Sequence, residues 1–179
     1  MEELLNKNFH LILKTFLLMR LCSVCISAWN ETRLRRLGVL EYGRQNSMML
    51  LLLHVAYYMV CFMEGDIAIV PADVTSCIGL TAYTFSILML YYVIFQIGHL
   101  WTVKLLVAPR PYHVINKSFL FRYVKHPNYY LNIIPELCGL ALIFHSWYTL
   151  CIGLPVYLIP LIIRIRQEEQ VMRTEFDNY

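Results

Sequence analysis

The chain is built of long apolar runs separated by short polar segments. A helix of about 20 residues crosses the hydrocarbon core of a bilayer, which is about 30 Å thick. The pattern therefore predicts an all-α, polytopic membrane protein with five transmembrane helices. The predicted spans are residues 9–29, 48–63, 78–101, 127–144 and 146–163.

Two of these runs contain charged residues. Lys14 and Arg20 interrupt the first run, and Glu136 lies inside the fourth. An acid in a spanning helix costs on the order of 3 kcal/mol and usually faces the bundle interior or a polar cavity. Glu136 follows Pro127 by about 13 Å of helix, which places it near the middle of the bilayer. It is expected to hold the bundle together or to line a deep pocket.

Basic residues alternate between the connections. The first connection and the third (residues 104–125) are rich in Lys and Arg, the second and fourth have none, and the tail after residue 163 is again basic. Because basic connections stay on the cytoplasmic side, we expect the N-terminus outside and an amphipathic C-terminal segment in the cytoplasm. The fourth and fifth runs are separated only by His145 and its neighbours, which predicts a tight antiparallel hairpin.

Composition agrees with this interpretation and excludes several functions. The 179 residues are 59% hydrophobic and only 15% charged, so a single membrane domain over 1–179 is expected. The net charge of +3 is scattered, which argues against nucleic-acid binding. No G-x-G pattern exists, so a Rossmann-type nucleotide site is excluded. The cysteines lie in apolar runs, and the histidines of the third connection lie on separate pieces of it, so no metal is expected.

The segment 122–130 concentrates cationic and aromatic residues directly before the fourth run. Proline suits the first helical position, so this helix should begin at Pro127. Its positive end, beside Lys125, would suit the carboxylate of a ligand. The alternative is a membrane anchor in which Tyr123, Tyr129 and Tyr130 form an aromatic belt.

A second charged group follows the fifth run. Arg164 and Glu168 are four residues apart and share one helical face. They could form a solvated ion pair. Alternatively, Glu168 and Glu169 could bind a cationic ligand while Arg164 holds a carboxylate bidentately.

Two motifs resemble those of the integral-membrane isoprenylcysteine carboxyl methyltransferases and their bacterial relatives. Arg122-Tyr123-Val124-Lys125-His126-Pro127-Asn128-Tyr129 is similar to R-Y-x-R-H-P-x-Y, and Arg164-Ile165-x-x-Glu168-Glu169 is similar to R-I-x-x-E-E. Phe176 and Tyr179 also match. The resemblance covers residues 96–179, and Trp101-Thr102 with the following Lys104 is similar to the bacterial branch. Weaker support comes from Glu41-Tyr42-Gly43 and His54. The chain departs from the pattern at Lys125, where arginine is common, and at Tyr130-Leu131-Asn132.

The resemblance implies an S-adenosylmethionine-dependent methyltransferase whose catalytic core spans about 96–179. Carried over by position, Arg164 and Glu168 would lie at the reacting centre. The expected cofactor contacts are Tyr123, Val124, Lys125, His126, Pro127, Tyr129 and Glu169. The expected acceptor contacts are Trp101, Thr102, Lys104 and Glu136. A lipophilic or prenylated acceptor would enter from the bilayer, and the site would face the cytoplasm at a bacterial inner membrane.

Three functions are consistent with these residues. The first is O-methylation of the carboxylate of a lipidated, isoprenylcysteine-like acceptor, which is ionised at pH 7 and needs no base. The second is O-methylation of an alkylpyrone or alkylresorcinol, whose hydroxyl would need Glu168 or His126 as a base. The third is a non-catalytic membrane scaffold or lipid-binding protein.

Overall fold

The computed structural model describes residues 2–65, 73–107, 120 and 123–175. These residues confirm the predicted helical class. The helices are α1 (Glu2–Arg35), α2 (Arg44–Glu64), α3 (Val74–Ile97), α5 (Ile134–Ile143) and α6 (Leu154–Glu175), with a short 3₁₀ turn η1 (Gly98–Leu100) and two π-helical segments, η2 (Asn128–Ile133) and η3 (Thr149–Gly153). Two three-residue strands, β1 (Leu40–Tyr42) and β2 (Leu105–Val107), pair antiparallel with Tyr42 opposite Leu105. The sequence pattern did not predict this small sheet.

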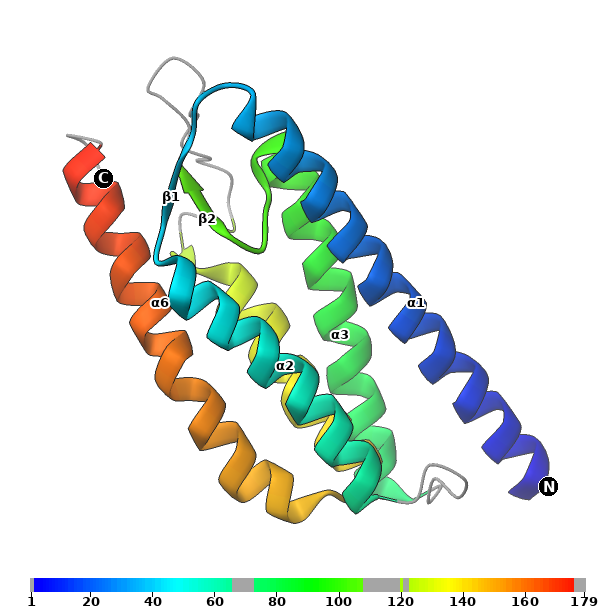
Figure 1. Cartoon of the computed structure of the whole chain (residues 1–179). Coiled ribbons are helices and arrows are strands. Elements are labelled where there is room, and N and C mark those ends of the chain that lie inside the picture. The colour runs from blue at the N-terminus through cyan, green and yellow to red at the C-terminus, as the bar shows by residue number, and fades with distance from the viewer. Residues whose placement is uncertain (1, 66–72, 108–119, 121–122, 176–179) are drawn as a thin grey trace.

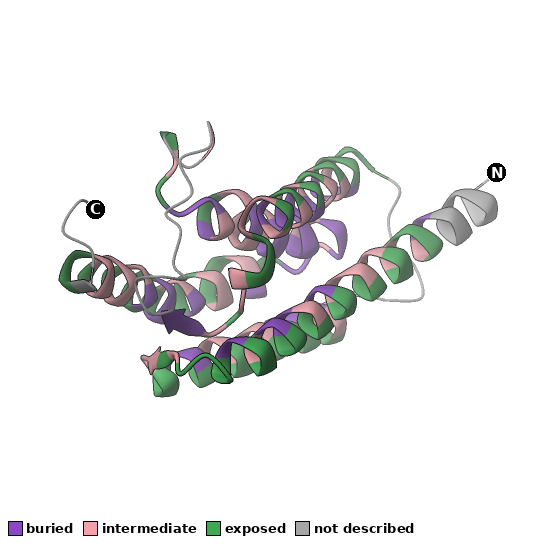
Figure 2. Cartoon of the chain, turned by 90° about the horizontal axis from the view of Figure 1, so that it is seen from above, coloured by how far each residue is buried: buried purple, intermediate pink, exposed green. Residues whose placement is uncertain are grey.

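The helices form a bundle in which α3 and α5 make the most extensive contact (Figure 1). Helix α6 packs along α2, and α1 runs along α3 at the outside of the bundle. The sheet lies at the end of the bundle where α1 and α6 finish. Figure 2 shows that the outer side of α1 is exposed, whereas buried residues gather at the centre. The described parts of the basic connections therefore share one end of the molecule.

Two glycines allow α3 and α5 to approach closely. A Cβ atom on Gly79 would lie 2.7 Å from the carbonyl oxygen of Gly139, and a Cβ on Gly139 would lie 2.7 Å from the carbonyl oxygen of Gly79. Small residues at a crossing point bring helix backbones together in membrane proteins. The hydroxyl of Ser76 adds a hydrogen bond to the carbonyl of Ile143 at 3.2 Å. The pair forms the centre on which the other helices pack.

All five predicted runs are helical, and four of the helices are long and apolar enough to cross a membrane. These are Phe9–Arg35, Arg44–Glu64, Val74–Leu100 and Thr149–Thr174. The run predicted at 127–144 forms only η2 and α5, of six and ten residues. Most of α5 is buried against protein, so its apolar composition reflects packing inside the bundle. The membrane orientation stays a prediction.

Both π-helical segments end two residues before a proline. Ile134 N–H bonds the carbonyl of Tyr129 before Pro135, and Leu154 N–H bonds the carbonyl of Thr149 before Pro155. A proline inside a helix lacks a donor and its ring clashes with the carbonyl four residues earlier. The wider turn accommodates that clash, and neither segment was predicted.

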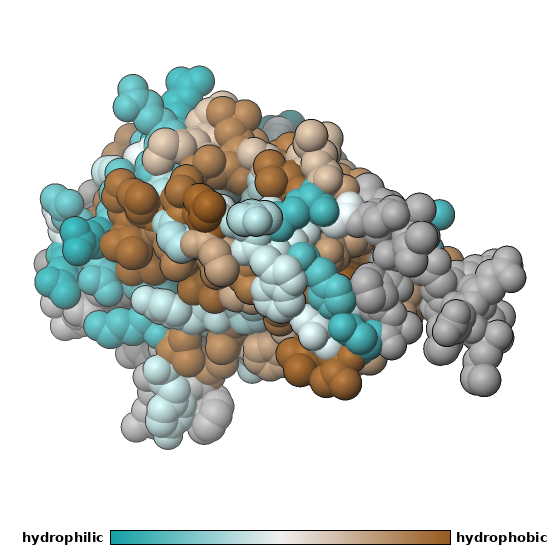
Figure 3. All heavy atoms as spheres, turned by 90° about the horizontal axis from the view of Figure 1, so that it is seen from below, coloured by the Kyte–Doolittle hydropathy of each residue, from teal (hydrophilic) through white to brown (hydrophobic). Residues whose placement is uncertain are grey.

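The connection between α5 and α6 is as short as predicted. His145 has a positive φ of 53° there, and the Glu64 carboxylate at the end of α2 accepts hydrogen bonds from the backbone of Tyr148 and Thr149 at 2.7 and 2.8 Å. Helix α5 contacts η3 at this turn, as in the predicted hairpin, but α6 then packs along α2. The end of the molecule that carries this turn presents apolar side chains interrupted by polar groups (Figure 3).

Candidate functional site

Arg164 on α6 is the centre of the candidate site. Its side chain is buried, with 3% of the residue exposed. Nη1 donates to the Ser47 hydroxyl of α2 at 2.6 Å, Nη2 donates to the Val103 carbonyl at 3.0 Å, and Nε donates to the Tyr129 hydroxyl at 3.3 Å. The guanidinium therefore joins α2, η2, α6 and the segment before β2.

Tyr129 connects Arg164 to Glu168. Its hydroxyl donates to Glu168 Oε2 at 2.6 Å while it accepts from Arg164. Arg164 and Glu168 share a helical face as predicted, but the phenol stands between them, so the contacts of Arg164 in the described part of the chain are all with uncharged oxygens. The alternative of a solvated ion pair does not describe this buried arrangement.

His126 lies between two carboxylates of α6. Nδ1 is 3.4 Å from Glu168 Oε1, and Nε2 is 3.4 Å from Glu169 Oε1. The imidazole is buried and stacks on the Tyr129 ring, with centroids 5.8 Å apart. Burial alone would lower the pKa of His126, but the two carboxylates outweigh it and raise the pKa above its ordinary value.

The helix start at Pro127 is confirmed. The His126 carbonyl accepts hydrogen bonds from the backbone of Tyr129 and Tyr130 at 3.1 and 3.2 Å, which closes the first turn. This turn brings His126 and Tyr129 to α6. The other expected cofactor residues lie around it: Pro127 is buried, Val124 is half-buried, and Tyr123 and Lys125 are exposed. Arg122, the first residue of the motif, lies outside the described residues.

The segment from Trp101 to Lys104 reaches the site through its backbone. Trp101 is buried, and its carbonyl accepts from the Asn30 amide at 2.9 Å. Thr102 donates to the Lys104 carbonyl at 2.8 Å, and Lys104 Nζ lies 2.6 Å from Glu31. The residue between them, Val103, is the one whose carbonyl holds Arg164. The segment is thus adjacent to the site, with Lys104 directed to α1.

Glu136 lies apart from this group, in a deeper polar cluster. Its carboxylate is fully buried and Oε1 is 3.0 Å from Arg20 Nε, 2.5 Å from the Tyr58 hydroxyl and 3.4 Å from His54 Nε2. Tyr157 contacts the other nitrogen of His54 at 3.2 Å. These contacts join α1, α2, α5 and α6, as expected of a residue that holds the bundle together.

The polar cluster around Arg164 and the one around Glu136 form two layers of the bundle, and the same three segments contribute to both. Each segment contributes a residue to each layer, seven positions apart: Ser47 and His54 on α2, Tyr129 and Glu136 on η2 and α5, and Arg164 and Tyr157 on α6. Seven residues rise about 10 Å along a helix. Sequence reasoning missed Ser47 and Val103, which carry no signal of their own.

Comparison with known proteins gives a family for this arrangement. Residues 77–174 match the model of the isoprenylcysteine carboxyl methyltransferase (ICMT) family. An uncharacterized protein of Haemophilus influenzae is 46% identical over 87% of this chain and 90% of its own length. The uncharacterized protein YpbQ of Bacillus subtilis is 23% identical over 92% of this chain and 96% of its own length. No solved structure matches significantly. The chain belongs to the isoprenylcysteine carboxyl methyltransferase family.

Proposed function

We propose that the protein is an S-adenosylmethionine-dependent O-methyltransferase that acts on the carboxylate of a lipidated, isoprenylcysteine-like acceptor. The observation that supports a carboxylate is the environment of Arg164. A buried cation is costly unless an anion balances it, and the described contacts of this guanidinium are all with uncharged oxygens. Glu168 acts on the guanidinium only across the Tyr129 hydroxyl, so a carboxylate acceptor would be the group that pairs with Arg164 directly, whereas a neutral phenol or enol would not.

The residues near Arg164 fit the methyl donor. Bound S-adenosylmethionine supplies a methyl group on a sulfonium and also carries an ammonium and a carboxylate. Glu168 and Glu169 present anionic oxygens suited to positive groups, and Lys125 at the helix start is suited to the carboxylate. Arg164 would orient the acceptor carboxylate. Tyr129, whose hydroxyl contacts both Arg164 and Glu168, would hold these two side chains in fixed positions relative to each other. Since that carboxylate is already ionised, positioning is the main task of these residues.

The remaining proposals concern acceptor contacts and membrane placement. Trp101, Thr102 and Lys104 would line the acceptor side, because Val103 between them contacts Arg164. Glu136 would contribute to acceptor binding from the deeper polar layer. We place the N-terminus outside and the Arg164 end of the bundle in the cytoplasm of a bacterial cell, where the methyl donor is made. The basic connections at that end support this orientation.

The test compares acceptors and variants in detergent-purified protein. Calorimetry should detect S-adenosylmethionine binding, and a prenylcysteine acceptor should be methylated in preference to an alkylresorcinol or alkylpyrone. Arg164→Lys loses the planar fork and should lower kcat/KM for the prenylcysteine by about 100-fold, equivalent to about 2.7 kcal/mol. Arg166→Lys, an exposed position on the same helix, is the control.

Two results would contradict the proposal. Transfer to the phenolic or enolic lipid with none to prenylcysteine would exclude the carboxylate acceptor. Absence of cofactor binding in protein that is shown to be folded would instead favour a non-catalytic lipid-binding protein.

A further inference from the structure

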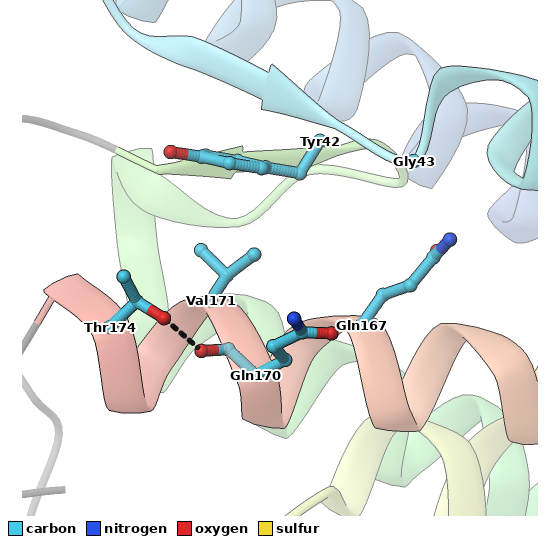
Figure 4. A pocket seen from close by; sticks show the side chains of 6 residues that line it. All are labelled: Tyr42, Gly43, Gln167, Gln170, Val171 and Thr174. Atoms are coloured by element: carbon cyan, nitrogen blue, oxygen red, sulfur yellow. Dashed lines mark hydrogen bonds between the residues drawn. The ribbon is translucent and has the colours of Figure 1, made fainter.

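A cavity of about 310 Å³ lies between the end of β1 and the last turns of α6 (Figure 4). On α6 its lining follows a helical stripe with spacings of three and four residues. Glu168 and Glu169, which approach His126, lie off this stripe on another side of the helix. The cavity is thus separate from the side of α6 that faces His126. It is lined by Tyr42, Gly43, Gln167, Gln170, Val171 and Thr174.

The lining is mostly apolar, with polar groups at a few positions, and its residues carry no formal charge. Gln167 and Gln170 contribute primary amides, and each amide both donates and accepts hydrogen bonds. The Tyr42 ring lies over the side of α6 from which Val171 points toward it (Figure 4). A flat, neutral group fits between an aromatic ring and an aliphatic side chain, with amides at its edge. A phosphate would find no cation among these residues.

The cavity is connected to the Arg164 site through Gly43. The Gly43 carbonyl accepts from the Ser47 hydroxyl at 3.1 Å, and Ser47 in turn accepts from Arg164. Gln167 is one helical turn beyond Arg164, and its side-chain oxygen is 3.5 Å from the Asn46 amide. That long contact leaves the Gln167 amide free to exchange its partner for a ligand.

We propose that this cavity binds the neutral, flat, hydrogen-bonding part of the methyl acceptor beside the group that Arg164 holds, and that Gln167 selects among acceptors. This inference rests on the proposed function. The shared chemistry is a planar unit with adjacent donor and acceptor atoms. Two sources present it: the amide next to the carboxylate of an N-acyl prenylcysteine, and the hydroxylated ring of an alkylresorcinol.

Gly43 offers a substitution that alters the cavity. A Cβ atom there would lie 2.3 Å from the Gln167 side-chain oxygen, so Gly43→Ala must displace that amide. Gly43 has a φ of +60°, where an L-residue is strained. Gly38 has a φ of +74° with nothing within 4 Å. Gly38→Ala therefore carries a similar backbone strain without the contact and is the matched control.

Equilibrium binding of each acceptor to detergent-purified protein, without cofactor, tests the proposal independently of turnover. Gly43→Ala should weaken binding of at least one of the two acceptors about tenfold relative to Gly38→Ala, while S-adenosylmethionine affinity changes less than twofold. Gln167→Ala alone should weaken the same binding, and adding Gly43→Ala to it should cause little further loss, because the amide that the new Cβ would displace is already gone. The acceptor whose binding responds identifies the source.

Three outcomes overturn the inference: equal binding by the two glycine variants for both acceptors, a further tenfold loss when Gly43→Ala is added to Gln167→Ala in folded protein, or no binding of either acceptor to the wild type. If the acceptors bind and respond as expected but no methyl transfer or cofactor binding is found, the proposed function fails while the cavity assignment stands.

Discussion

At the residue scale, His126 couples the helix start at Pro127 to α6, and its protonation should therefore affect stability. The carboxylates of Glu168 and Glu169 raise its pKa against the effect of burial. A group whose pKa is raised in the folded state stabilises the fold fully below its unfolded pKa, about 6.5 for histidine. That stabilisation is lost as the pH rises through the folded pKa.

We expect the thermal midpoint of the wild type to fall between pH 6.5 and the raised pKa, by about 3–5 °C for each unit of pKa difference. His126→Gln removes the titrating group and should flatten the profile in this window. His99→Gln, at an exposed histidine of η1, should keep the wild-type profile. Thermal unfolding in detergent across pH 6 to 9 measures this, and an unchanged slope in His126→Gln would refute the argument.

At the scale of elements, the crossing of α3 and α5 should tolerate no added atom. A Cβ on Gly79 would lie 2.7 Å from backbone atoms of Gly139 and Ile143, which cannot move aside as a side chain can. Gly79→Ala should cost about 1–3 kcal/mol through overpacking. Gly153→Ala in η3 meets a side-chain atom first, at 3.2 Å, and should stay within about 1 kcal/mol of the wild type. Comparing thermal midpoints decides this, and equal losses would contradict it.

Some of the helices and strands could be predicted from the sequence and others could not. Apolar runs predicted all the helices because their signal is long and continuous, and proline chemistry predicted the start at Pro127. The same reasoning predicted a spanning helix over 127–144, whereas the structure divides this run into η2 and α5, which are not among the four helices long and apolar enough to cross a membrane. The strands β1 and β2 are too short for a pattern.

The residues of the candidate site also divide into those that a sequence motif predicts and those that no sequence pattern marks. His126, Tyr129, Arg164, Glu168 and Glu169 were predicted by motif and are found together. The partners that hold Arg164 were not, because Ser47 and Val103 lie 117 and 61 residues from it and a serine or a backbone carbonyl has no distinguishing spacing.

At the scale of the whole molecule, two polar layers about 10 Å apart hold an otherwise apolar bundle together. The upper layer, around Arg164, joins α2, η2 and α6 through one guanidinium. The deeper layer also attaches α1, because Arg20 pairs with Glu136. Helix α1 packs mainly on α3 and otherwise exposes large apolar side chains. Its attachment therefore depends on a few specific contacts, and among the ion pairs that join α1 to the rest of the described chain this one is the most buried.

Breaking that pair from one side should be more harmful than removing both partners. Arg20→Met leaves the Glu136 carboxylate buried without its guanidinium, which typically costs about 3–5 kcal/mol. Arg20→Met combined with Glu136→Gln removes both charges and should recover much of that loss. Lys14→Met, at an exposed position of α1, should have little effect. Thermal midpoints of the three variants form the measurement, with proteolysis of α1 as a second readout. If Arg20→Met were as stable as Lys14→Met, the ion pair would not be what attaches α1, and the stacking of Phe16 on Tyr83, with ring centroids 5.3 Å apart, would become the stronger explanation.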